Sequence, residues 1–151
     1  MEIALDEPYP LLETLLKRSL EKKEYRDRVV LFSPPLFPET ADLCLYDHDH
    51  FSPRFLRRAK LIVVPSEAKG AVSSRHVLTA GMGLFDPLTF SSLKEDRAML
   101  CLQKGVAIGK CRLEPREVWV PYDPFYSVYK NLAVGMALLI CDEIFGRKRN
   151  E

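Results

Sequence analysis

Leucines at helical spacing follow Pro10 near the start of the chain. They recur every three to four residues, with charged side chains between them: Leu11, Leu12, Leu15, Leu16 and Leu20. This spacing predicts an amphipathic helix that packs one apolar stripe on the core. Pro10 suits the first turn of such a helix, and Lys22 and Lys23 suit the negative end of its dipole.

Short continuous apolar runs come next, separated by loops: Val29–Phe32, Leu43–Tyr46, Leu61–Val64 and Val77–Ala80. Runs of this length predict strands of a parallel or mixed sheet that is covered on both faces. Between two of the runs, Ser52 and Pro53 predict the start of a short helix. Arg54, Arg57 and Arg58 would then share one face of that helix.

More closely spaced β-type runs fill the second half: Leu88–Leu93, Ala98–Gln103, Val106–Leu113 and Glu117–Tyr122. Their connections are too short for helical crossovers, so we expect antiparallel hairpins. Gly109 interrupts the third run and predicts a bulge. Trp119 alternates with two valines, and we expect it to be buried in the core. The stretch 127–145 predicts a final helix, with Gly146 just beyond its end.

Together these elements predict a single domain over residues 1–151, of the α/β or α+β class. We expect a short parallel or mixed sheet plus an antiparallel β meander, flanked by N- and C-terminal helices. Residues 1–75 would hold the first helix and the short strands, 76–122 the β-rich part, and 123–146 the C-terminal helix.

Composition narrows the function classes. The chain has 22 basic and 21 acidic residues, and this balance argues against a nucleic-acid partner. The longest apolar run, Leu132–Cys141, is too short for a membrane span, which needs about 20 residues. No secretion signal is recognisable at the N-terminus. The four cysteines are widely spaced and lie inside apolar segments, which favours buried, reduced thiols in a cytoplasmic protein over disulfides or a zinc site.

The densest group of potential metal ligands is Asp47-His48-Asp49-His50. In an extended backbone His48 and His50 would lie on one face, where they could bind zinc with a third ligand such as His76. The competing interpretation is a polar loop after a strand, in which Asp49 or Ser52 caps the next helix. We favour the polar loop.

Gly81 and Gly83 follow a predicted strand, at the end where open α/β sheets bind ligands. Glycines there let the backbone approach a ligand closely, or simply form a turn. The chain contains neither a Walker sequence nor G-x-G-x-x-G, so no triphosphate cradle is predicted. Asp47 and Tyr129 are the other residues that we expect to line a ligand crevice.

Two segments carry a family resemblance. His76–Gly83 (HVLTAGMG) resembles the strand that ends the central ATP-binding domain of Mur ligases and folylpolyglutamate synthases. Phe125–Cys141 (FYSVYKNLAVGMALLIC) resembles the helix that opens their C-terminal part. Family asparagines near the nucleotide correspond here to Ser127 and Lys130, and the P-loop and metal-binding motifs are missing. The resemblance therefore implies a degenerate remnant without ligase activity.

The sequence leaves three functions open. The first is a non-catalytic domain that binds a small anionic or nucleotide-like ligand, or a protein, at the carboxyl ends of its strands. The second is a metal-dependent hydrolase in which His48, His50 and an aspartate hold a metal that activates water. The third is a structural homodimer or interaction module joined through a β edge or an aromatic surface. The sequence does not identify a cofactor.

Overall fold

The computed structural model describes residues 1–52 and 59–146 of the chain. The predicted short helix with Arg54, Arg57 and Arg58 lies outside the described residues, as does the chain after Gly146. Within them the fold is α/β, and the predicted fold class is confirmed.

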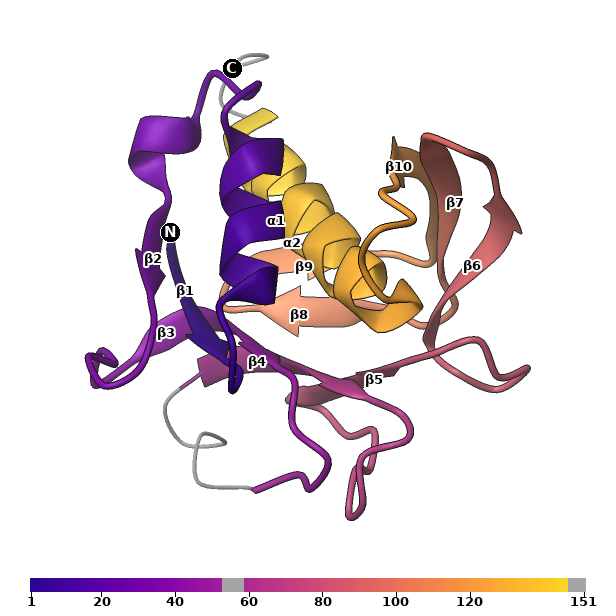
Figure 1. The fold of residues 1–151 in the computed structure, drawn as a ribbon, viewed down its shortest axis with the longest axis horizontal. Helices are drawn as coiled ribbons and strands as arrows, with labels where there is room; N and C mark the ends of the chain where they lie inside the picture. Colours follow the sequence, from indigo (N-terminus) through magenta and orange to yellow (C-terminus); the bar gives the residue numbers. More distant parts are fainter. Residues whose placement is uncertain (53–58, 147–151) are drawn as a thin grey trace.

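A mixed sheet forms the centre of the fold, with the strand order β10-β7-β6-β5-β4-β3-β1-β2 (Figure 1). The strands are β1 Glu2–Asp6, β2 Val30–Phe32, β3 Ala41–Tyr46, β4 Ala59–Pro65, β5 Val77–Ala80, β6 Leu88–Leu93, β7 Arg97–Leu102 and β10 Arg116–Pro121. Neighbours from β2 to β6 run parallel, whereas β7 is antiparallel to both β6 and β10. The parallel strands therefore end at one edge of the sheet, which we call the carboxyl edge.

The strand order reverses direction at β1. The chain leaves β1 through helix α1 (Leu11–Leu20) and the short helix η1 (Arg26–Arg28) to reach β2 on one side. It then returns to form β3 on the other side of β1. The gap between the ends of β1 and β3 is thus a topological switch point, where open α/β sheets bind ligands.

Helix α2 (Val128–Gly146) is the centre of the main core. It lies beside α1 on one face of the sheet (Figure 1), and its residues 131–141 are all buried. The hairpin of β8 (Val106–Ile108) and β9 (Cys111–Leu113) also contacts it. Because neighbours surround α2, it is apolar on all sides, as a buried helix must be. No helix of the described chain is long and apolar enough to cross a membrane.

On the opposite face of the sheet, loop residues within the described parts of the chain cover the strands. Cys44, Ile62 and Val64 on this face are buried and belong to a second apolar cluster, in which Phe37 and Phe51 from the loops also pack. The prediction that both faces are covered is therefore correct for β1, β3, β4 and β5, to which the strand residues of this cluster belong.

Three details differ from the sequence predictions. The strand β1 was not predicted, because its apolar part is only three residues long. Val106–Leu113 is not one bulged strand but the hairpin β8–β9, which turns at Gly109 with φ +59°. Trp119 is not core: it is 39% exposed, and Lys94 and Arg97 lie over its ring.

The cysteines agree with the prediction in part. None of the four forms a disulfide. Cys44 and Cys141 are buried as expected, whereas Cys101 and Cys111 are partly exposed. Burial raises the pKa of Cys141 to about 12, which keeps its thiol protonated and unreactive at neutral pH.

The tight packing of α2 on the sheet at Gly135 gives a test of this core. A Cβ added at Gly135 would lie 3.2 Å from Cγ2 of Val120 and 3.7 Å from Leu100. We expect Gly135→Val to lower the free energy of unfolding by about 2 kcal/mol, because the added side chain overpacks the core. Urea denaturation measures this. Gly146→Val is the matched control, because no atom lies within 4 Å of a Cβ added at Gly146. The stability of this variant should stay near that of wild type.

Candidate functional site

A hydrogen bond between His48 and Asp6 spans the switch point. Asp6 ends β1 and is 2% exposed, and His48 follows β3. Nε2 of His48 lies 2.8 Å from Oδ1 of Asp6. A carboxylate in this position accepts a hydrogen bond from Nε2–H and so fixes the tautomer of the ring. This leaves Nδ1 as the ring atom that can contact a ligand.

Residues in the first turn of α2 also contact the carboxyl edge of the sheet. The Lys130 ammonium lies 2.8 Å from Oδ2 of Asp47, and both side chains are mostly buried. The neighbouring Tyr129 hydroxyl contacts the backbone carbonyls of Tyr46 in β3 and Val63 in β4. Burial raises the pKa of Tyr129 well above its usual value, and the charge of Asp47 adds to this, so the hydroxyl keeps its proton.

Glu7 occupies the N-terminus of α1. Its carboxylate accepts hydrogen bonds from the backbone N–H groups of Leu11, Leu12 and Glu13, at 3.0, 2.7 and 3.0 Å. Burial raises the pKa of Glu7 by more than these bonds lower it, and Asp47 raises it further. In open α/β proteins the helix after the first strand often holds a phosphate at this position. Here a carboxylate of the chain itself takes that place.

A cavity of about 420 Å³ lies beside this network, between the loops that follow β3 and β4. Its lining is mostly charged or polar: Asp47, His48, Asp49, His50, Pro65, Glu67, Ala68 and Lys69. The two loops are joined by a hydrogen bond from Lys69 N–H to the Asp49 carbonyl, at 2.8 Å. The volume is in the range of small-molecule sites. The predicted Asp47–His50 loop therefore lines a cavity rather than a flat surface.

The glycine turn after β5 is filled by the side chain of Asp86, which also contacts Ser66 after β4. Oδ2 of Asp86 accepts a hydrogen bond from Gly83 N–H at 2.7 Å and lies 3.4 Å from Oγ of Ser66. A Cβ at Gly81 would fall 2.2 Å from that same Oγ and 2.6 Å from Asp86. The absence of side chains at Gly81 and Gly83 thus makes room for Asp86. The two glycines do not line the cavity beside His48.

Metal-ligand geometry is not present in residues 1–52 and 59–146, where no three His, Cys, Asp or Glu side chains are grouped to hold an ion. His48 is bonded to Asp6 instead. His76 immediately precedes β5 and is exposed, so it lies at the opposite end of the parallel strands from His48. The idea of His76 as the third ligand is therefore wrong.

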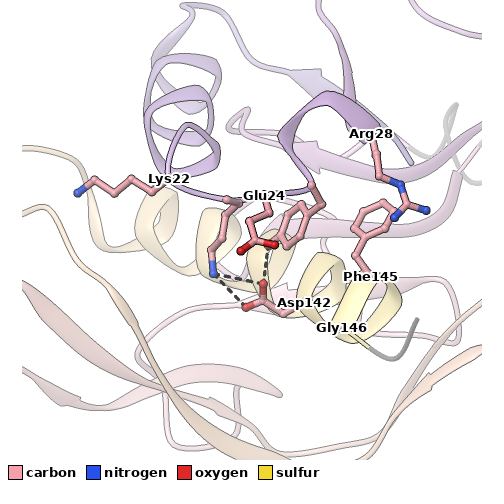
Figure 2. Close-up of a pocket in the computed structure, with 8 residues that line it drawn as sticks. Lys22, Glu24, Arg28, Asp142, Phe145 and Gly146 are labelled. Atoms are coloured by element: carbon pink, nitrogen blue, oxygen red, sulfur yellow. Dashed lines mark hydrogen bonds and ion pairs between the residues drawn. The ribbon is translucent and has the colours of Figure 1, made fainter. Parts of the chain in front are cut away.

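A larger hollow of about 570 Å³ lies where α1 and α2 end, away from the carboxyl edge (Figure 2). Its Asp142 accepts hydrogen bonds from Tyr25 at 2.5 Å and from Lys23 at 3.2 Å. Tyr25 stacks on Phe145, and Arg28 lies 4.5 Å from the centre of the Phe145 ring. The rings and the carboxylate are thus used internally, and the negative ends of two helices oppose an anion there. We regard the carboxyl edge as the better site.

Several residues of the site were not singled out from the sequence as site residues, among them Asp6, Glu7, Glu67 and Lys130. The apolar triplet Ile3-Ala4-Leu5, placed between acidic residues, could have indicated a short strand ending at Asp6. No local signal indicates the Lys130–Asp47 pair, because the two residues lie on distant elements that only the fold brings together.

Comparison of the chain with family models, with curated proteins and with solved structures finds no match.

The cap on α1 provides a test of the site's scaffold. Glu7→Gln removes one carboxylate oxygen and turns an amide N–H₂ toward backbone donors. We expect the free energy of unfolding at neutral pH to fall by about 1–2 kcal/mol. Chemical denaturation measures it, with Glu21→Gln at the exposed far end of α1 as the unaffected control. Equal stability of Glu7→Gln and wild type would show that α1 does not depend on this carboxylate.

Proposed function

We propose that the protein is a non-catalytic binding domain for a small polar ligand, held in the cavity between the loops after β3 and β4. The observation that carries the proposal is the hydrogen bond across the topological switch point between Asp6 and His48, the second of which is one of the residues that line the cavity. An imidazole fixed by a buried carboxylate presents its remaining nitrogen in a defined direction. Such preorganisation favours recognition of a ligand over a purely structural role.

The charges of the lining indicate the ligand's chemistry. Asp49, Glu67 and Lys69 are exposed and line the cavity with His50. Asp47, by contrast, is already neutralised by Lys130. A ligand with hydrogen-bond donors or an amino group suits the two remaining carboxylates, and a polar acceptor group suits Lys69. A zwitterionic or amino-bearing small molecule therefore fits better than the small anionic or nucleotide-like ligand that the sequence alone led us to expect.

The α1 cap supports the same choice. Because Glu7 already accepts three backbone N–H bonds at the start of α1, a phosphate at that position would displace it and face its charge. A nucleotide would have to bind without the usual helix N-terminus. We therefore propose that phosphate recognition is not the role of this edge.

The proposed origin as a degenerate Mur-ligase-like remnant rests on the order of elements. The HVLTAGMG segment forms β5 and its turn, antiparallel strands follow, and the FYSVYKNLAVGMALLIC segment spans most of α2. The loop after β1 carries Glu7 in place of a P-loop. Both features support a chain that keeps part of the architecture without the nucleotide chemistry. Thiols without disulfides support a cytoplasmic location for it.

The test is a thermal-shift screen with amino acids, amines, nucleosides, nucleotides and divalent metal salts as probes. We expect at least one amino-bearing compound at a saturating concentration to raise the Tm of wild type by about 5 °C. His48→Ala should lose this shift, whereas His76→Ala, on the opposite edge, should keep it. Stabilisation by a metal salt that His48→Ala abolishes would instead support the metal-dependent hydrolase. A shift that persists in His48→Ala, or none with any probe, would contradict the proposal.

A further inference from the structure

The outermost strand of the antiparallel part, β10, has one edge without a neighbour among the described strands (Figure 1). The Tyr122 N–H, just after β10, donates to the Asp96 carbonyl at 3.0 Å. In an antiparallel ladder such bonds alternate, so the even-numbered residues of β10 direct their backbone groups to β7. The backbone N–H and C=O groups of Glu117 and Trp119 therefore point away from β7, toward the open edge.

The side chains at this edge have opposite character. Trp119 is partly exposed, with the Lys94 ammonium 5.3 Å and the Arg97 guanidinium 4.5 Å from its ring centre. Glu117 is two residues earlier on the same face of the strand and is exposed. One short edge thus presents a carboxylate next to an aromatic ring that carries two cations.

We propose that β10 pairs antiparallel with β10 of a second copy of this chain, with Val118 on the two-fold axis. In this register Glu117 of each copy lies opposite Trp119 of the other, and both residues have outward backbone donors and acceptors. The carboxylate of Glu117 then approaches the cations over the second copy's ring. Pro115 and Pro121, which have no N–H to donate, lie opposite each other.

Neighbouring registers are worse. A shift of two residues in one direction places Glu117 opposite Glu117, and like charges directly opposite destabilise a strand pair. The same shift in the other direction places Trp119 opposite Trp119 and brings the cations of both copies together. A shift of one residue pairs outward backbone groups with groups that already face β7. Of these registers, only the one with Val118 on the two-fold axis pairs outward backbone groups with each other and opposite charges with each other.

The contact is short, so the dimer is weak and its population depends on concentration. Sedimentation velocity of the full chain over a wide concentration range measures this directly. We expect Glu117→Lys and Arg97→Glu each to weaken dimerisation about tenfold, because each places like charges across the interface. The combination of the two substitutions should restore it. Glu95→Lys, in the exposed turn between β6 and β7, makes the same charge change away from the interface and should dimerise as wild type.

Circular dichroism of each variant checks that the fold is intact, and the doubly substituted chain keeps the test informative if one single variant unfolds. A wild-type chain that stays monomeric at the highest concentration would overturn the proposal. So would a dimer that both single charge reversals leave unchanged, because its interface would then lie elsewhere. Failure of either kind leaves the small-ligand proposal untouched, since the His48 cavity is remote from β10 in the strand order.

Discussion

The contact of Tyr129 with the carbonyls of β3 and β4 determines how helix α2 is placed on the sheet. The hydroxyl is buried, and without a carbonyl partner it would carry the cost of an unsatisfied polar group. Its position at the first turn of α2 fixes where that helix begins on the sheet. The next residue, Lys130, then reaches Asp47, so one helical turn anchors both the core helix and the loop that carries His48.

The charges at the carboxyl edge are largely neutralised by the chain itself. Lys130 pairs with Asp47, His48 contacts Asp6, and Glu7 caps α1. In a nucleotide-binding α/β protein the same positions would face phosphate groups. Internal pairing stabilises the edge without a ligand. The polar cavity that remains lies beside these pairs, between the loops after β3 and β4. This arrangement is why we favour a modest small-molecule site over nucleotide chemistry.

Much of the fold was predictable because its signals are local. The leucine stripe gave α1, the apolar stretch after Ser127 gave α2, and the short runs gave most of the strands. The strand β1 was not predicted because a run of three apolar residues is too short to be distinctive. Trp119 was wrongly expected in the core, since alternation shows which residues share a face but not whether that face is covered.

The candidate site was predictable only in part. The Asp47–His50 loop stood out as a dense cluster of polar residues, and it does line a cavity. The partners that give the loop its chemistry, Asp6 and Lys130, come from opposite ends of the chain, and no local pattern reports such pairs. Gly81 and Gly83 had a plausible ligand role in the sequence, yet the structure shows that they accommodate Asp86.

The most direct measurement is the tautomer of His48 in solution, from nitrogen-15 NMR of its imidazole in the unliganded protein. We predict that Nε2 carries the proton of the neutral ring, because it donates to the buried Asp6 carboxylate, and that Nδ1 is unprotonated. Asp6→Asn should change the imidazole signals of His48 and leave those of exposed His76 unaltered. A neutral His48 with its proton on Nδ1, or with signals indifferent to Asp6→Asn, would contradict the arrangement on which the proposed site depends.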